Sequence, residues 1–420
     1  MPVSNREEEF PIKTATACQL KWQHSTVFLT TGKTSSCHRV NKDTIPLDTF
    51  DFHNTEEKLE ARQRMLEGKW PGKGCEHCRN IEDAGGFSDR QLHLKHPGIL
   101  PPPELETDKT AIKVTPRQLE IYFSNLCNLK CMYCNPSFSS SINTENSKFG
   151  KFSKDGVMIP GKISITPNHE LLKEKLFTWL EHNIDKLHKI LILGGEPFIQ
   201  PETEKLFDFL ETKKLPDLTI VTFSNLTIEH NKFKNRLSRL QKLKDDKAIE
   251  QIQIVGSIDC WGEQAAYIRS GLNLELFEKN FEFLVNETDH LLCVNSVITP
   301  LTVKTMPALV KKINEWSKNR TVYWTFMKES SPKKHQHPTI FGKDVLQLGL
   351  QQSYDVFETF NDPEKTNSKK YLGGIISEIE KAAPDTEAQK QLLIYLNELD
   401  RRRNTNFRLL FPELAELLEG

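Results

Sequence analysis

Apolar and polar positions alternate along the middle of the chain in a way that predicts strands separated by amphipathic helices. The stretch 168–183, for example, places its apolar residues at helical spacing on one face. Strands that alternate with helices are typical of a parallel sheet joined by helical crossovers. Six strand candidates cover residues 119–124, 189–193, 218–223, 251–257, 291–297 and 321–326. We therefore expect an α/β fold, a partial (β/α)6 barrel of the TIM type.

The flanking regions lack this alternation. Residues 1–110 contain scattered aromatic residues, and the segment HPGILPPPELE near their end disfavours both helix and sheet. The polar, Ser-rich stretch 137–165 is expected to be a mobile surface loop or a lid. The expected domains are an N-terminal Cys-rich metal-binding domain at 1–110, the partial barrel at 111–330 and an α-helical C-terminal region at 331–420.

Composition indicates a globular protein without an excess of either charge. Lys and Arg number 56 against 57 Asp and Glu, and 37% of the residues are hydrophobic. This balance gives no reason to expect specific nucleic-acid binding. The first residues are acidic where a signal peptide has an apolar run, and no segment approaches the roughly 18 apolar residues of a membrane span. We expect a cytoplasmic protein with no membrane partner.

Three of the nine cysteines stand in one short loop, CNLKCMYC. Cys127, Cys131 and Cys134 follow the first predicted strand, where parallel α/β folds present functional loops. Three thiolates can hold three corners of a cubane and leave one iron free, whereas a structural zinc site has four closed ligands. The alternatives are three buried thiols, or a zinc knuckle that borrows a His or an Asp.

This loop resembles the signature of the radical S-adenosylmethionine (SAM) superfamily, including the aromatic Tyr133 before the third cysteine. The resemblance covers about residues 115–330 and implies a [4Fe–4S] cluster whose open iron binds SAM. It also implies reductive cleavage of SAM to a 5′-deoxyadenosyl radical that abstracts hydrogen from a substrate. A flavodoxin- or ferredoxin-like protein is the expected electron donor.

Polar groups that follow later strands resemble the family's SAM-binding segments. GGEP after the second strand is similar to the motif that binds the methionine amine, and GSIDCWGE and YIRSG resemble the segments for the ribose and the methionine carboxylate. Turn residues and a solvated helix arginine are the alternatives. The cofactor-binding residues implied are Tyr133 in the cysteine loop, Gly194, Gly195, Glu196 and Pro197 for the amine, Asn225 after the third strand, Ser257 and Asp259 for the ribose, and Arg269 for the carboxylate.

A second cysteine group precedes the barrel and consists of Cys18, Cys37, Cys75 and Cys78. Four ligands that end in Cys-x2-Cys make a closed metal site, for which zinc and an iron–sulfur cluster are both reasonable, and His38 or His77 could replace a thiol. The arrangement resembles twitch and SPASM-type radical enzymes, whose auxiliary clusters usually follow the barrel. We expect a second iron–sulfur cluster, or zinc.

Two further features have a functional and a structural interpretation. Cys260 could return a hydrogen atom to the substrate, or it is a buried, inert cysteine. The basic run 401–403 is expected to be a solvated helix end that complements the helix dipole.

The substrate class expected from auxiliary-cluster relatives is a peptide or protein side chain. A small metabolite such as a sugar or a nucleotide is the alternative within the same chemistry. A non-catalytic interaction protein with zinc at both cysteine groups is the alternative from another class.

Overall fold

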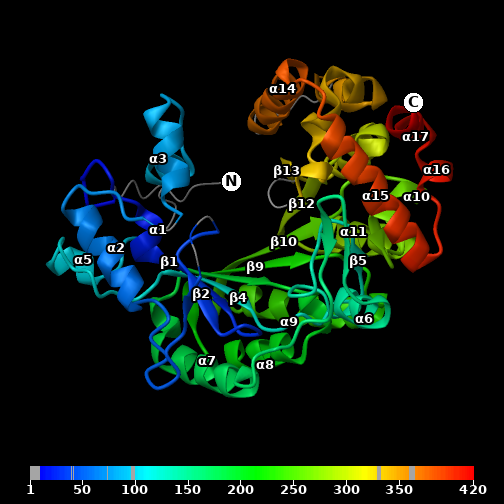
Figure 1. Ribbon diagram of the computed structural model, residues 1–420. Coiled ribbons are helices and arrows are strands. Elements are labelled where there is room, and N and C mark those ends of the chain that lie inside the picture. Colours follow the sequence, from blue (N-terminus) through cyan, green and yellow to red (C-terminus); the bar gives the residue numbers. More distant parts are fainter. Residues whose placement is uncertain are drawn as a thin grey trace.

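A nine-stranded sheet in the order β13-β12-β10-β9-β8-β4-β1-β2-β3 forms the centre of the molecule (Figure 1). The structure is a computed structural model that describes residues 10–38, 40, 42–72, 74–95, 100–328, 333–358 and 365–420. Neighbouring strands from β13 to β1 run parallel, and β2 and β3 form an antiparallel edge. The strands are β1 His24–Phe28, β2 Lys33–Ser35, β3 Asp43–Thr44, β4 Gln118–Tyr122, β8 Lys189–Leu193, β9 Leu215–Ser224, β10 Ile249–Ser257, β12 Leu291–Ile298 and β13 Val322–Lys328.

Crossover helices pack on one face of this sheet, and Figure 1 shows α7, α8 and α9 beneath it. Strand residues alternate accordingly: Leu119 and Ile121 of β4 are fully buried in the same apolar core as Leu176 and Leu180 of α7. The crossover helices are α7 His169–Asn183, α8 Pro201–Leu210, α9 His230–Asp245, α11 Leu274–Glu287 and α12 Met306–Trp316, with the 3₁₀ turns η1 Ile184–Lys186, η2 Pro197–Ile199 and η3 Val303–Thr305. The expected α/β partial-barrel fold is confirmed.

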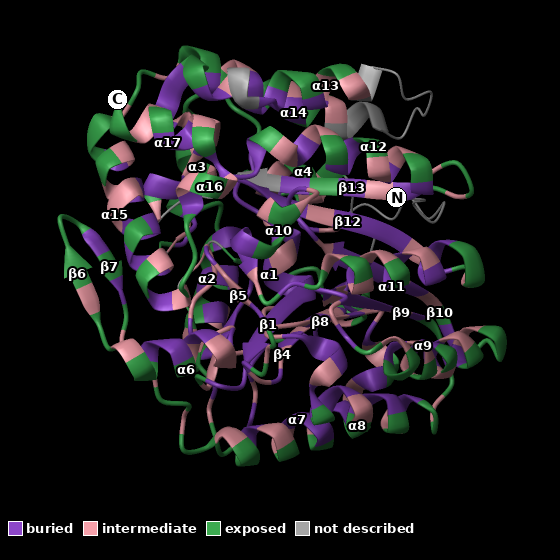
Figure 2. Ribbon diagram, turned by 90° about the vertical axis from the view of Figure 1, so that its right-hand side faces the viewer, coloured by how far each residue is buried: buried purple, intermediate pink, exposed green. Residues whose placement is uncertain are grey.

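The opposite, inner face of the sheet is less covered. Leu191, Phe223 and Tyr323 are only partly buried there, around a small apolar cluster formed by Val221, Val255 and Cys293. Figure 2 shows buried strands and helices whose outward sides are exposed.

The sheet extends further toward the N-terminus than the sequence predicts. β1 pairs in parallel with β4, from His24 opposite Gln118 to Phe28 opposite Tyr122, so residues before 110 belong to the same sheet. The domain boundary near residue 110 stays a prediction, and residues 96–99 of its proline-rich segment lie outside the described residues. The N-terminal helices are α1 Gln19–Gln23, α2 Glu56–Leu66, α3 Glu76–Asp83, α4 Asp89–Lys95 and α5 Glu104–Thr107.

The stretch 137–165 is not the loop or lid expected from its polar composition. It forms helix α6, Ser140–Phe149, and a hairpin of β6, Phe152–Lys154, with β7, Val157–Ile159. Ser139 caps α6 by accepting a hydrogen bond from the Ile142 amide (3.2 Å). The helix has no long apolar stripe because its buried face includes the polar Glu145 and Asn146.

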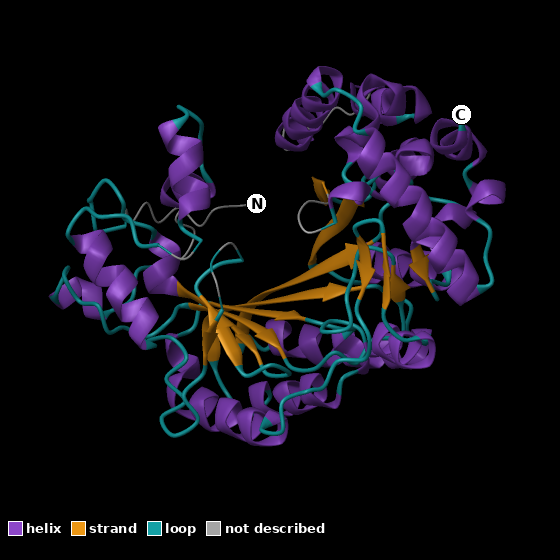
Figure 3. Cartoon of the chain, viewed as in Figure 1, coloured by secondary structure: helices purple, strands orange, loops and turns teal. Residues whose placement is uncertain are grey.

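The expected helical C-terminal region is confirmed. Figure 3 shows these helices at the opposite end of the sheet from the N-terminal ones. They are η4 Lys334–Gln336, η5 Pro338–Leu348, α13 Leu350–Glu358, α14 Lys365–Lys381, α15 Thr386–Arg403, α16 Phe407–Leu410 and α17 Pro412–Glu419. Across the described residues, none of the helices combines the length and the apolar character needed to cross a membrane.

Candidate active site

The three cysteines of the central loop lie together beyond the carboxyl end of β4. Cys131 belongs to the short strand β5, Lys130–Cys131, which pairs antiparallel with β11, Arg269–Ser270, so that Cys131 stands opposite Arg269. The Cys134 amide donates to the Cys131 carbonyl (3.1 Å) and closes the turn between them. Cys127, Cys131 and Cys134 are all partly buried. The Cys127 thiol interacts electrostatically with Cys131 and Cys134, so the structure places near one another the three thiols that the sequence predicted as ligands.

Serine residues at the start of α6 hold the main chain of this loop. The Cys127 amide donates to Ser140 Oγ (3.1 Å), and the hydroxyls of Ser140 and Ser141 donate to the Cys127 carbonyl (3.2 and 2.7 Å). Ser139 Oγ donates to the Leu129 carbonyl (2.7 Å). The polar segment after the third cysteine thus supports the loop, a role that sequence reasoning missed because serines are common in ordinary turns.

The environment of the thiols disfavours the free thiolate. Burial raises the pKa of Cys127 and of Cys134 to about 12, and burial also raises the pKa of Cys131 against the opposing charge of Arg269. The ligand form of cysteine is the thiolate, so metal binding at this loop must displace protons.

Asp259 and Arg269 bind each other next to the loop. Arg269 donates from Nε and Nη2 to the two oxygens of Asp259 (2.8 Å each), and Tyr133 donates its hydroxyl to Asp259 Oδ2 (2.7 Å). The Val297 amide donates to Asp259 Oδ1 (2.9 Å). Arg269 also reaches Cys131 Sγ (3.9 Å). Three residues predicted to bind SAM are therefore in contact, and their assignment to ribose and carboxylate stays a prediction.

Glu196 is a fully buried carboxyl group between two strand ends. Its oxygens accept from the Phe198 amide (3.1 Å), the Ser224 hydroxyl (2.9 Å) and the Asn225 amide (2.6 Å). Burial raises the pKa of Glu196 to about 7, because it outweighs these hydrogen bonds. Asn225 also donates from Nδ2 to Asn128 Oδ1 (2.8 Å), which joins the end of β9 to the cysteine loop.

The two glycines before Glu196 allow a close approach to the cysteine loop. Gly194 and Gly195 have positive φ angles of 79° and 58°. A Cβ atom on Gly195 would lie 2.2 Å from the Leu126 carbonyl oxygen, and one on Gly194 would lie 2.6 Å from the Tyr122 ring. The Glu196 amide donates to that same Leu126 carbonyl (2.8 Å), so the end of β8 is tied to the loop.

The remaining predicted residues of this site differ in accessibility. Pro197 is buried and begins the 3₁₀ turn η2. Ser257 ends β10 and is partly buried, and no hydrogen bond of its side chain is found within the described part of the chain. Cys260 is fully buried in the main apolar core, where burial raises its pKa to about 12, and its role as a hydrogen donor stays a prediction.

The four N-terminal cysteines line one pocket with a cavity volume of about 30 Å³, which they share with Trp70 and the buried Lys21. Burial raises the pKa of Cys18 to about 12, and the nearby Cys37 and Cys75 contribute to the rise. His38 and His77 are exposed and do not line the pocket. The cysteines of the pocket are Cys18, Cys37, Cys75 and Cys78.

Neither cysteine group is arranged to bind a single metal ion. Within the described ranges, no three Cys, His, Asp or Glu side chains are placed so that they could hold one metal ion. A cubane takes one thiolate per iron, so its ligands do not have to meet at one point. The three partly buried thiols of the central loop supply the donor set of a cubane held at three corners.

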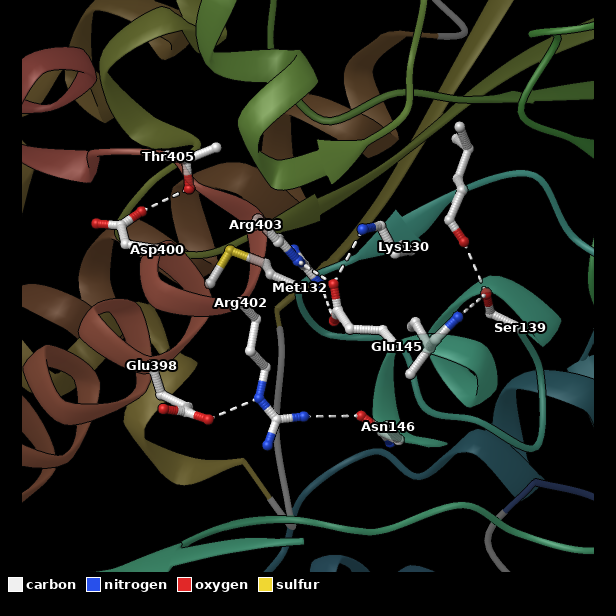
Figure 4. Close-up of polar contacts among 12 residues, drawn as sticks. Lys130, Met132, Ser139, Glu145, Asn146, Glu398, Asp400, Arg402, Arg403 and Thr405 are labelled. Atoms are coloured by element: carbon white, nitrogen blue, oxygen red, sulfur yellow. Dashed lines mark hydrogen bonds and ion pairs between the residues drawn. The ribbon is translucent and has the colours of Figure 1, made fainter. Parts of the chain in front are cut away.

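The expected solvated helix end at 401–403 is wrong for two of its three residues. The side chains of Arg402 and Arg403 are 1% and 6% exposed, whereas Arg401 is 58% exposed. Figure 4 shows Arg403 directed at Glu145 of α6 and Arg402 at Asn146. These arginines therefore join α15 to the element that supports the cysteine loop.

The sequence is similar to several proteins that carry the same name. A protein named "Probable GTP 3',8-cyclase" from Methanococcus maripaludis strain C6 is 24% identical over 273 residues, 64% of this chain and 78% of that protein. The protein of the same name from strain C5 is 22% identical over 257 residues, 61% of this chain and 72% of that protein. No family model matches the sequence.

These relatives agree with the resemblance that the Cys-x3-Cys-x2-Cys loop carries. The resemblance of the chain to the radical S-adenosylmethionine superfamily is confirmed. The cofactors of this radical SAM enzyme are a [4Fe–4S] cluster and SAM, and the loop of Cys127, Cys131 and Cys134 has the chemistry to hold the cluster.

Two solved structures are also similar to this chain. A histidine-tagged anSMEcpe with bound AdoMet has 18% identity and a TM-score of 0.36 and covers 65% of this chain. "Native anSMEcpe with bound AdoMet and Kp18Cys peptide" has 18% identity and a TM-score of 0.37 and covers 59%. The chain spans 62% of the length of each of these proteins.

Proposed function

We propose that this enzyme cleaves SAM reductively and removes a hydrogen atom from a peptide or protein side chain. When bound, the cluster supplies one electron that splits SAM into methionine and a deoxyadenosyl group, which takes a hydrogen atom from the substrate. The grouping of Cys127, Cys131 and Cys134 beside Arg269 and Glu196 is the observation that supports this proposal. A flavodoxin- or ferredoxin-like protein is the proposed electron donor.

The residues around the cluster loop have the chemistry to hold SAM. Glu196 offers a carboxyl group for the methionine amine, Arg269 a guanidinium for the carboxylate, and Ser257 a hydroxyl without a described partner for the ribose. Asp259 would act by holding Arg269, since its oxygens already accept four hydrogen bonds.

Anaerobic reconstitution with iron and sulfide tests the proposal. The wild-type protein should gain iron–sulfur absorbance and release 5′-deoxyadenosine from SAM when dithionite or reduced flavodoxin is added. Cys131→Ala should abolish this release, whereas Cys293→Ala, a buried thiol away from the loop, should retain it. Release of 5′-deoxyadenosine from Cys131→Ala, or a colourless wild-type protein that holds only zinc, would refute the proposal.

The inner face of the sheet supports a substrate with little negative charge. Its strand positions carry apolar and amide side chains such as Phe223, Tyr323, Gln253 and Asn295, and Lys189 is the one cation at the described inward positions of β4, β8, β9, β10, β12 and β13. A nucleoside triphosphate normally needs several cations. A peptide needs apolar contacts and amide hydrogen bonds, which this face can offer.

The substrate class can be tested with mixtures of stated chemistry. The reconstituted enzyme should release 5′-deoxyadenosine faster with a peptide fraction of a cell extract than without it, and mass spectrometry should find a peptide of altered mass. GTP and the nucleotide fraction serve as separate arms, because the sequence relatives are named as GTP cyclases. Stimulation by GTP or by the nucleotide fraction alone would replace the peptide proposal by the small-metabolite alternative.

The N-terminal pocket supports a second iron–sulfur cluster as part of the same proposal. Its four thiols and the buried ammonium of Lys21 suit an anionic metal–thiolate centre. Cys75→Ser with Cys78→Ser should lower the iron content of the reconstituted protein while the cluster of the central loop remains. Unchanged iron with lost zinc would assign the pocket to zinc.

A further inference from the structure

Two side chains of the C-terminal region reach the main chain between the ligating cysteines. The Tyr395 hydroxyl of α15 donates to the Met132 carbonyl (2.5 Å). Lys333 Nζ donates to the carbonyls of Met132 (3.1 Å) and Cys134 (2.8 Å). Both carbonyls belong to the segment that carries the second and third thiols, so these contacts act on the shape of the loop itself.

Helix α15 is fixed to the start of the same segment by a chain of ion pairs in which Glu145 and Arg403 are buried and Lys130 is partly exposed. Arg403 donates from Nε and Nη2 to the two carboxylate oxygens of Glu145 (3.2 Å each), and Lys130 Nζ donates to Glu145 Oε1 (3.0 Å) (Figure 4). Lys130 directly precedes Cys131. Burial alone would raise the pKa of Glu145, but Arg403 and Lys130 hold it below its usual range. The chain is therefore ionic.

Arg402 adds a second connection between α15 and α6. It donates from Nη1 to Asn146 Oδ1 (3.1 Å), from Nη2 to the Gly150 carbonyl (3.0 Å) and from Nε to Glu398 Oε1 (2.7 Å). A buried guanidinium with partners on three sides allows little freedom, because any movement leaves a charge without a hydrogen bond. Tyr395, on the same helix, is thus held in place for its contact with the loop.

The charge of Lys333 bears on electron transfer to this site. An added electron makes a cluster more negative, and a cation nearby stabilises the more negative state. Net charge and hydrogen bonding around the ligands set the potential of iron–sulfur clusters. A cation that touches the carbonyl of a ligating residue is therefore placed to ease reduction.

We propose that Lys333 and Tyr395 are positioning residues, which shape the cluster loop and raise the reduction potential of the cluster bound there. This inference rests on the proposed function, because it needs a cluster on Cys127, Cys131 and Cys134. It adds that the C-terminal region takes part in the redox step, although it supplies no ligand.

Lys333→Met in the full-length, reconstituted protein tests the electrostatic part. The cluster of the loop is recognised by the change of its electron paramagnetic resonance signal on addition of SAM, and its midpoint potential is measured by titration. Lys333→Met should shift this potential to more negative values. Lys333→Arg keeps the positive charge and should leave the potential close to that of the wild type. The matched control is Lys334→Met. The Lys334 side chain is 75% exposed and pairs with Asp385, so its replacement should leave the potential unchanged.

Tyr395→Phe tests the positioning part, because it removes only the hydroxyl. It should increase iron loss during gel filtration and alter the SAM-dependent signal, whereas Thr288→Val, which loses a hydrogen bond to the Leu284 carbonyl (2.8 Å) at the end of α11, should not. An intact cluster with an unchanged potential in Lys333→Met overturns the inference and leaves the proposed function standing. A wild-type protein without a SAM-responsive signal overturns both. Equal iron loss in Tyr395→Phe and Thr288→Val also counts against the inference.

Discussion

Asp259→Asn is the substitution whose cost the structure defines best. The carboxylate is 1% exposed and accepts four hydrogen bonds, two from Arg269, one from Tyr133 and one from the Val297 amide. An asparagine keeps one acceptor oxygen and turns an amide donor toward donor groups, while the Arg269 guanidinium stays buried without its counter-charge. Removing one partner of a buried ion pair costs about 3–5 kcal/mol.

Urea unfolding of the metal-free protein measures this cost without any contribution from the cofactors. We expect Asp259→Asn to lose about 3–5 kcal/mol, with faster amide exchange in β5 and β11. The control is Asp208→Asn. The Asp208 side chain is 69% exposed and pairs with Arg239 at the surface, so this substitution should lower the free energy of unfolding by less than about 1 kcal/mol. If Asp259→Asn is as stable as this control but binds SAM more weakly, the carboxylate is a ribose ligand and our account of Arg269 is wrong.

Three further substitutions probe the cluster loop and the N-terminal pocket. Gly195→Ala should lower the iron content far more than Gly68→Ala. Both positions have positive φ, which costs about 1–2 kcal/mol, but a Cβ at Gly195 overlaps the Leu126 carbonyl oxygen, whereas one at Gly68 meets nothing within 4 Å. Glu196 holds its proton in the folded state up to about pH 7 and loses it near pH 4.5 when unfolded, so the stability of the wild type should fall by about 3 kcal/mol across that window. Glu196→Gln should lack this fall in pH-dependent urea midpoints, and an identical pH profile would contradict the pKa. Lys21→Met should weaken metal retention at the N-terminal pocket by about tenfold, which corresponds to about 1.4 kcal/mol, and unchanged retention in competition with a chelator would show that its charge is not felt there.

The parallel sheet could be predicted because its strands are apolar and evenly separated by helices. The extension of the sheet by β1 could not, because the pairing of Thr26 with Glu120 joins residues far apart in the sequence. Helix α6 was missed for a different reason. Its buried face carries Glu145 and Asn146, and a hydrophobic pattern does not report buried polar residues that find partners elsewhere in the chain.

The site shows the same division between local and distant information. The spacing of Cys127, Cys131 and Cys134 is a local signal, and the structure brings these thiols together. The burial of Arg402 was not visible in a run of three arginines, because it depends on Asn146, 256 residues earlier. Local spacing identified the ligands, whereas their supports required the fold.

The long separation between Met132 and Tyr395 has a consequence for how the protein is made. The two residues that form this hydrogen bond are 263 positions apart in the chain. At a synthesis rate of about 5–20 residues per second, the cysteine loop leaves the ribosome roughly 10–50 s before the tyrosine that secures it. During that interval the three thiols lack their final support, so a cluster can enter a completed loop only after Tyr395 has been synthesised and α15 has folded against α6.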